Sequence, residues 1–337
     1  MASEEPSQPS SDGASAPPSG PHPSSDRHLE FLSFNEEGGL LMGCSDLCGR
    51  VWSGSAWFYG DPKKAPSRCG GSSAVMECED GVSEGLFLQK DSVLLALDSG
   101  ALETLLLQEG PYFERISVVL EHDDLITGLT RSPDRIMTSS YDKSIVIYDP
   151  HCALALDTRL LASDLLSDVA SNPLDPFSLA SAALDGTVAL WDLRTPTSPP
   201  TTLYKDPSNW PTALAWSPQD DKSLFIGTQS GEISNYDIRQ LSSPTHSDHS
   251  MDKQIHKILF SPSQPDIVAV SADTFPVRIF DVEEGFKVLY TDERHEDFVR
   301  GLAWHPKEGD LWTCGWDRLV LSHPLPIKNN NTNAAAT

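Results

Sequence analysis

The chain has 337 residues, with 24 basic and 49 acidic side chains and a formal net charge of −25. This excess of acid repels nucleic-acid phosphates, so it argues against direct nucleic-acid binding and favours solubility and basic partners. No apolar run approaches the ~18 residues of a membrane span, and the beginning of the chain lacks the basic and apolar parts expected of a secretory signal.

Residues 1–28 are predicted to be a disordered tail, because Ser, Pro, Gly and Ala dominate them without an apolar period. Residues 328–337, with their run of asparagines, are predicted to be a second disordered tail. The folded domain is expected at 29–327. The 6 cysteines form no C-x-x-C pair, so we expect no metal site and reduced thiols in the cytoplasm and nucleus.

An internal repeat runs through residues 29–327. Each copy has a small or acidic turn, followed six residues later by an aromatic or equivalent residue, as from Asp142 to Tyr148; in the copy ending at Phe280 the turn carries one extra residue after Asp273. The copies end at positions 52, 105, 148, 191, 236, 280 and 323, so the first step is 53 residues and the others are 43 to 45. Prolines that follow strand-like runs, from Pro133 to Pro306, repeat with nearly the same step.

This period predicts the fold. Repeats of about 40–45 residues made of short β-branched and aromatic runs are typical of one four-stranded sheet per repeat. The sequence therefore predicts an all-β, seven-bladed β-propeller whose sheets stack into a closed ring. The excess in the first step lies in residues 58–74, which are expected to loop out between blades one and two. Which strand closes the ring is left open.

The repeats resemble the WD-repeat family. WDLR at 191–194 and YDIR at 236–239 match its signature. Hydrogen-bonded side chains brace the blades of this family, and the structural residues that the resemblance implies here are His122, Asp142, Asp185, Trp191, His295 and Asp317.

Two segments, 45–66 and 295–326, are similar in particular to the WD-repeat subunits of the methylosome. That resemblance implies a non-catalytic scaffold that binds and stabilises the type II protein arginine methyltransferase in a hetero-octamer. It also implies help in presenting Sm proteins and histones for symmetric arginine dimethylation. No cofactor is expected, because S-adenosylmethionine belongs to the enzyme subunit. The absence of a nucleophile elbow, phosphate loop or dinucleotide fingerprint also argues against an enzyme.

The resemblance places the docking contact on the first blade, beside the insert at 58–74. Aromatic residues alternate poorly there, which predicts an exposed aromatic contact on an outer strand. Trp52 also holds the ordinary aromatic position of the repeat, so blade core is its alternative. Arg300 could reach a partner or form an internal ion pair. The predicted partner-binding residues are Arg50, Trp52, Trp57, Phe58, Tyr59, Asp61 and Arg300.

An alternative function uses the same motifs. The W-D-x-R form at 191–194 also resembles WD-repeat substrate receptors of cullin–RING ubiquitin ligases. That function predicts binding to the ligase adaptor rather than to a methyltransferase.

Overall fold

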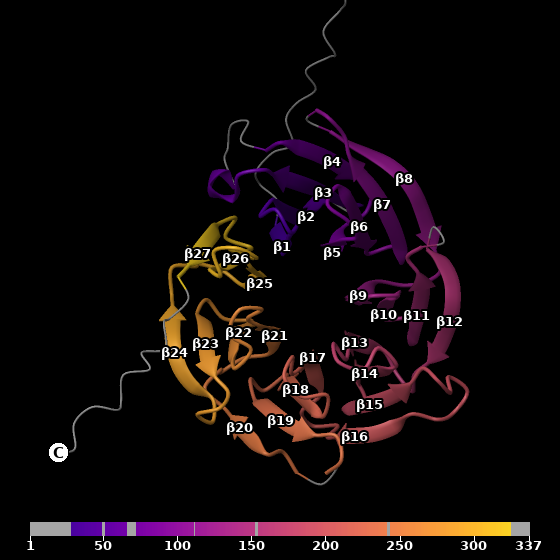
Figure 1. Cartoon of the computed structure of the whole chain (residues 1–337), viewed down its shortest axis with the longest axis vertical. Helices are drawn as coiled ribbons and strands as arrows, with labels where there is room; N and C mark the ends of the chain where they lie inside the picture. The colour runs from indigo at the N-terminus through magenta and orange to yellow at the C-terminus, as the bar shows by residue number, and fades with distance from the viewer. Residues whose placement is uncertain are drawn as a thin grey trace, which may run out of the picture.

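The computed structural model describes residues 28–48, 51–65, 72–110, 112–151, 154–240 and 243–324, and at 47, 48, 51 and 52 it describes the backbone alone. These residues form seven antiparallel sheets arranged around a common axis (Figure 1). The predicted seven-bladed all-β propeller is confirmed. Apart from His28, which begins β1, the predicted tails at 1–28 and 328–337 lie outside the described residues.

The strands follow one another from the axis outward in each blade. Blade one contains β1 (His28–Phe34), β2 (Leu40–Cys48), β3 (Val51–Tyr59) and β4 (Ala74–Cys78). Blade two contains β5 (Val82–Phe87), β6 (Ser92–Leu97), β7 (Ala101–Leu107) and β8 (Phe113–Leu120). Blade three contains β9 (Ile126–Ser132), β10 (Arg135–Ser140), β11 (Ser144–Asp149) and β12 (Ala155–Leu161). Blade four contains β13 (Leu166–Ser171), β14 (Ser178–Ala183), β15 (Thr187–Asp192) and β16 (Thr201–Lys205).

The remaining blades complete the ring. Blade five contains β17 (Pro211–Trp216), β18 (Ser223–Thr228), β19 (Ile233–Asp237) and β20 (His246–Asp248). Blade six contains β21 (Ile255–Phe260), β22 (Ile267–Ala272), β23 (Val277–Asp281) and β24 (Lys287–Asp292). Blade seven contains β25 (Val299–Trp304), β26 (Leu311–Gly315) and β27 (Val320–His323). A 3-10 helix, η1 (Pro62–Lys64), lies between β3 and β4.

The repeat landmarks correspond to fixed places in the blades. All seven repeat-end positions fall in the third strand of their blade, and the recurring prolines follow the first strand. The turn before the third strand contains Gly186 or Gly231 in blades four and five, at φ of 86° and 87°. Glycine adopts this backbone region without the steric cost that other residues meet there.

The expected position of the insert is wrong. Residues 58–74 include the end of β3 and the start of β4, so the extra length joins two strands of blade one. The repeat landmark lies on the third strand, and the fourth strand of the blade still has to follow it. The insert therefore lies before β4, and the connection between blades one and two is short.

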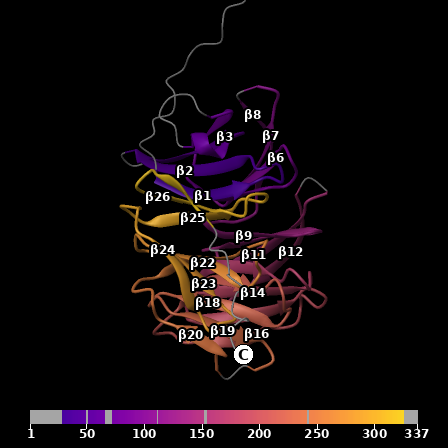
Figure 2. The same ribbon diagram turned by 60° about the vertical axis from the view of Figure 1, so that its left-hand side comes forward.

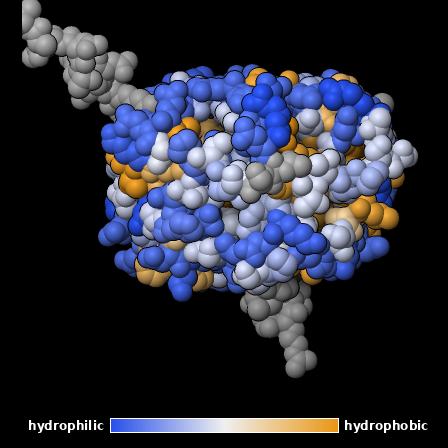
Figure 3. All heavy atoms as spheres, turned by 90° about the horizontal axis from the view of Figure 1, so that it is seen from below, coloured by the Kyte–Doolittle hydropathy of each residue, from blue (hydrophilic) through white to orange (hydrophobic). Residues whose placement is uncertain are grey.

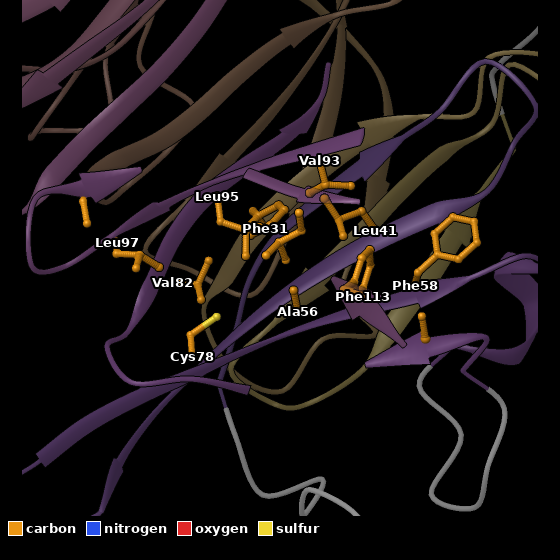
Figure 4. Packing of buried hydrophobic residues seen from close by; sticks show 13 residues of the cluster. Phe31, Leu41, Ala56, Phe58, Cys78, Val82, Val93, Leu95, Leu97 and Phe113 are labelled. Atoms are coloured by element: carbon orange, nitrogen blue, oxygen red, sulfur yellow. The ribbon is translucent and has the colours of Figure 1, made fainter. Parts of the chain in front are cut away.

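The hydrophobic core lies between the blades. Each pair of neighbouring blades shares one buried apolar cluster, including the pair of blades seven and one. Between blades one and two, Phe31, Phe58 and Phe113 come from β1, β3 and β8 (Figure 4). Because both faces of each sheet are apolar, a single blade cannot bury them, and stacking in a ring does.

A repeated hydrogen bond joins the innermost strands of neighbouring blades. In β5, β9, β13 and β17 the second residue lies at a register shift, and its side chain reaches the next blade. At four consecutive junctions a hydroxyl there donates to a carbonyl at the start of the next blade. These bonds are Ser83 to Ile126 at 2.8 Å, Thr127 to Leu166 at 2.9 Å, Ser167 to Pro211 at 2.8 Å, and Thr212 to Ile255 at 2.6 Å.

The junction of blades seven and one closes the ring by packing. Blade seven has three strands in the described part of the chain, and β25 and β26 lie beside β1 and β2 (Figure 2). Gly301 of β25 allows this close approach, since a Cβ there would lie 2.9 Å from the backbone nitrogen of Leu32. Met42 and Trp312 pack in the shared cluster.

Candidate partner-binding surface

Within the described residues, the β2–β3 hairpin of blade one extends beyond its two flanking strands. β2 and β3 pair as far as Cys48 and Val51, whereas the described residues of β1 and β4 pair with them only as far as Ser45 and Gly54. The end of the hairpin therefore projects by three residue pairs, or about 10 Å at ~3.3 Å per residue.

One predicted partner-binding position, Trp52, falls at this projecting end. The backbone of Trp52 is paired with Leu47 in β2. Arg50 and the side chain of Trp52 lie outside the described residues, so their contact with a partner stays a prediction. A hairpin that stands clear of its sheet offers its residues to another molecule.

The exposed aromatic contact predicted for Phe58 and Tyr59 is wrong. Only 8% of Phe58 and 1% of Tyr59 are exposed. β3 is not an outer strand, because β4 pairs with it from Gly54 to Phe58. Phe58 packs in the cluster with blade two and Tyr59 packs in the cluster with blade seven. Neighbouring residues of β3 are therefore buried on opposite faces of the sheet. Burial also raises the pKa of Tyr59 far above its ordinary value.

Trp57 and Asp61 lie away from the projecting end. Trp57 is half-buried against blade seven, and its indole N–H donates to Ser55 Oγ at 2.8 Å. Asp61 is exposed and accepts a hydrogen bond from the Lys63 backbone at 3.2 Å, which caps η1. It follows the far end of β3 from Trp52, about 30 Å away at ~3.3 Å per residue. The structure therefore does not bring Asp61 together with Trp52.

Arg300 forms the internal ion pair that was its alternative interpretation. Its Nη1 lies 3.4 Å from Asp273 Oδ1 and 2.9 Å from His256 Nδ1, with 17% of the side chain exposed. The guanidinium also lies 4.7 Å from the ring centroid of Trp316. These contacts tie blade seven to blade six. A direct contact of Arg300 with a partner stays a prediction.

An aromatic cluster at the junction of blades seven and one was not predicted. The Trp316 ring stacks on His28 at 4.7 Å and meets Phe298 edge-on at 5.5 Å. Its indole N–H donates to Glu30 Oε2 at 3.3 Å. We call His28, Phe298, Arg300 and Trp316 the Trp316 cluster. One feature of the sequence could have indicated this cluster. Trp316 directly precedes Asp317, the predicted bracing residue, and so belongs to the same turn.

A pocket of about 330 Å³ opens beside this cluster. Phe298 lines it together with Met251, Phe275 and Pro276, which come from the edges of blade six. Phe275 is 48% exposed and lies in the irregular turn after β22. The projecting hairpin, the Trp316 cluster and the pocket lie at the same end of their sheets. Together they form a candidate surface over blades six, seven and one.

The loops at this end of the sheets are acidic. They connect each outer strand to the next inner strand, and several of their carboxylates form no ion pair within the described residues. Exposed examples are Glu79, Asp123, Asp252, Glu293 and Glu296. Such a surface attracts basic segments and repels acidic ones.

The predicted brace of blade three is present. His122 Nδ1 lies 2.8 Å from Asp142 Oδ2, and His122 Nε2 lies 2.7 Å from Thr138 Oγ1. Ser144 Oγ donates to the other carboxylate oxygen of Asp142 at 2.7 Å. Burial lowers the pKa of His122, so its neutral ring donates to the carboxylate and accepts from the hydroxyl. The pair fixes the turn between β10 and β11.

Blade four has a simpler brace. Asp185 accepts hydrogen bonds from Ser163 Oγ at 2.7 Å and Thr187 Oγ1 at 2.6 Å, so a serine stands where blade three has His122. Trp191 is 7% exposed and its indole N–H donates to Ser181 Oγ at 2.9 Å. Both residues hold the structural positions that were predicted.

Blade seven extends the brace through a second histidine. His295 Nδ1 lies 2.7 Å from Asp317, and His295 Nε2 lies 2.8 Å from Thr313 Oγ1. Thr313 Oγ1 also lies 2.8 Å from Nε2 of His323, whose Nδ1 lies 3.2 Å from Arg294 Nη2. His323 therefore stands where five of the other six blades have an aromatic residue, and its polar ring joins a buried chain of hydrogen bonds.

The hydrogen bonds of His323 predict that the stability of the protein depends on pH. Burial lowers the pKa of His323 to about 4, against ~6.5 in an unfolded chain. As the pH falls, the unfolded state takes up the proton first. The stabilisation is therefore complete above pH ~6.5 and is lost as the pH falls towards ~4. His323→Gln should make the loss of unfolding free energy between pH 7 and pH 5 smaller by about 2 kcal/mol. Urea denaturation at both pH values measures this, and an unchanged pH dependence would contradict it.

Three charged side chains from alternate blades meet near the axis. Lys257 of β21 donates to Glu84 Oε1 of β5 at 2.5 Å, which links blade six to blade two across the ring. Asp168 of β13 accepts from the backbone nitrogens of Val169 and Leu214, both at 2.7 Å. Burial raises the pKa of Asp168 to about 7, and the charge of Lys257 opposes that rise.

In blades three and seven the same position of the inner strand is a glycine. Glu84, Asp168 and Lys257 are each the third residue of their strand, and Gly128 and Gly301 hold that place in blades three and seven. A Cβ at Gly128 would lie 2.9 Å from Asp168 Oδ1. Small residues therefore leave room for the charged ones.

Within the described residues, no three His, Cys, Asp or Glu side chains form a group that could hold a metal ion. No helix in that part of the chain is long and apolar enough to cross a membrane.

Seven stacked blades with His–Asp braces define a WD-repeat β-propeller with a candidate partner-binding surface. The chain is 30% identical over 314 residues to methylosome protein WDR77 of Xenopus laevis, covering 91% of this chain and 92% of that protein. It therefore belongs to the methylosome WDR77 family of WD-repeat proteins.

Other proteins are more distantly similar. Protein valois of Drosophila melanogaster is 21% identical over 88% of this chain and 85% of its own length. DDB1- and CUL4-associated factor 13 of Xenopus laevis is 22% identical over 74% of this chain, which spans 56% of that protein. Residues 158–315 match the model of the nucleolar protein 10-like N-terminal domain, a β-propeller.

Proposed function

We propose that this chain is a non-catalytic scaffold subunit of a methylosome, which binds and stabilises a type II protein arginine methyltransferase. The observation that supports the proposal most directly is the 30% sequence identity, over 91% of this chain, to a protein named methylosome protein WDR77. The projecting β2–β3 hairpin supports it, because a docking contact on the first blade needs residues that stand clear of the core.

The acidic loops support a second part of the proposal. Sm proteins and histones carry basic segments, and loop carboxylates such as Asp123, Asp252 and Glu296 would attract them towards the enzyme. In this proposal the enzyme subunit supplies S-adenosylmethionine and this chain supplies no cofactor. The assembly is a hetero-octamer that works in the cytoplasm and nucleus.

The test is reconstitution from purified proteins. The full chain is mixed with the type II arginine methyltransferase, and co-elution and Kd are measured. We expect a stable complex, and we expect Trp52→Ala to weaken it at least about 10-fold, as truncation of an interface tryptophan does. Leu174→Ala is the control, because Leu174 is 52% exposed in the first turn of blade four. Absence of any complex with the unmodified chain would overturn the proposal.

The cullin–RING alternative makes a different prediction. Similarity to DDB1- and CUL4-associated factor 13 favours it, and so do the two W-D-x-R-like motifs. However, Arg194 donates to Asp175 at 2.8 Å and lies 4.6 Å over the Phe177 ring, and Arg239 is paired with Asp237. Both arginines thus have internal partners. Binding of the ligase adaptor, abolished by Arg194→Ala, would support the alternative instead.

A further inference from the structure

Exposed apolar side chains are concentrated on the outermost strand of blade two. Ten large apolar residues are exposed in the described part of the chain, and four lie on β8 or immediately before it. They are Tyr112 at 54%, Ile116 at 55%, Val118 at 51% and Leu120 at 67%. The part of the rim that Figure 3 shows is mostly hydrophilic, with small apolar patches. Contiguous exposed apolar residues on a soluble protein mark an interaction site.

The register places two of these side chains on one face of blade two. Val118 and Leu120 lie opposite Glu103 and Ala101 of β7, and Ala101 packs in the cluster with blade one, so both belong to the face that is turned to blade one. Ile116 is the extra residue at a register shift and is 55% exposed. We call Ile116, Val118 and Leu120 the β8 strip.

The outer edge of β8 is almost unpaired. β8 is the last strand of its sheet, and in the described residues the one further pairing near it is a single bridge between Tyr112, which precedes β8, and Val75 of blade one. At eight residues it is also the longest outer strand described. A long apolar edge strand without protecting lysines or prolines promotes association with another chain.

The charges around the β8 strip indicate the kind of partner. Glu103 is 5% exposed, and burial raises its pKa. The negative charges of Asp80 and Glu79, in the connection from blade one, raise this pKa further. The cation on this side, Arg115, is already paired with Glu103 at 3.2 Å. Two copies of a chain of net charge −25 would bring these carboxylates together, so self-association is disfavoured.

The strip also continues the surface of blade one. Leu120 ends β8 at the same end of the sheets as the projecting hairpin, and β4, which pairs with β3, lies beside β8 (Figure 1). A partner seated on the hairpin would therefore meet the β8 strip next.

We propose that the β8 strip is a second contact for the methyltransferase subunit, which covers it with an apolar surface bordered by basic residues. The inference rests on the proposed function and extends its docking surface from blade one to blade two. Because the strip is exposed in the free chain, its residues contribute to binding without contributing to the core.

The experiment compares full-length variants in titrations with the purified methyltransferase. Ile116→Thr, Val118→Thr and Leu120→Thr are made singly and together, because threonine keeps the preference for strand. Together they should raise the Kd by about 10- to 100-fold, since each loses apolar burial. Val288→Thr is the matched control, as Val288 is 43% exposed on β24, the outer strand of blade six, and should leave the Kd unchanged. Thermal unfolding shows whether each variant is folded. If the triple variant is unfolded, the Kd values of the single variants are compared instead.

The outcomes separate the two proposals. A weaker Kd for the strip variants alone, with an unchanged control, supports the inference. If Trp52→Ala weakens binding while the strip variants bind like the unmodified chain, the β8 inference is overturned and the proposed function stands. If the unmodified chain does not bind the methyltransferase, both are overturned.

Discussion

Replacing His122 with alanine is expected to lower the free energy of unfolding by about 3 kcal/mol. The ring is 1% exposed and joins Asp142 to Thr138 at 2.8 and 2.7 Å. Its removal leaves a cavity and takes one partner from a carboxylate that is 8% exposed. An unpaired buried polar group costs more than a hydrogen bond contributes, so the loss exceeds that of an ordinary surface contact. Urea denaturation followed by tryptophan fluorescence measures it.

Blade four provides the comparison. Ser163 takes the place of His122 and donates one hydrogen bond to Asp185, at 2.7 Å and in an exposed position. Ser163→Ala should therefore cost no more than about 1 kcal/mol. His295→Ala, in the brace of blade seven, should resemble His122→Ala. If all three variants lower the free energy of unfolding by the same small amount, the histidine braces do not stabilise their blades more than the serine brace of blade four does.

The repeat and the braces could be predicted because they depend on local spacing. Asp142 and Tyr148 are six residues apart in a turn and the strand that follows it, and this distance recurs in the other blades except blade six, where Asp273 lies one residue further from Phe280. The fourth strand of blade one could not be placed in the same way. Ala74–Cys78 follows a long insert, and its pairing with β3 is a non-local contact that leaves no fixed spacing in the sequence.

The exposure of blade one could not be predicted for a related reason. Phe58 and Tyr59 look like a surface cluster when read along the chain, because every residue of the run is large. In a propeller both faces of a middle strand are buried against different blades. The Trp316 cluster joins residues of blades one and seven, almost the full chain apart, so neither segment alone reveals it.

The ion pair near the axis is expected to couple blades two and six. Lys257→Met should lower the free energy of unfolding by about 3 kcal/mol, because Glu84 then keeps its charge without a partner. Both side chains are about one quarter exposed, at 24% and 23%, so the cost lies at the low end for a buried pair. The loss of Lys257 also removes the charge that holds down the pKa of Asp168, so Asp168 should take up its proton at a higher pH.

A double-mutant cycle distinguishes this coupling from loss of packing. Glu84→Gln with Lys257→Met leaves neither charge unpaired, so the double variant should be more stable than the sum of the single effects by about 1–3 kcal/mol. Methionine keeps most of the length and apolar stem of lysine, which limits the cavity. Strictly additive effects would mean that the pair near the axis only fills space. The expected coupling would instead mean that charges from blades on opposite sides of the ring hold it together, as the hydroxyl bonds do between neighbours.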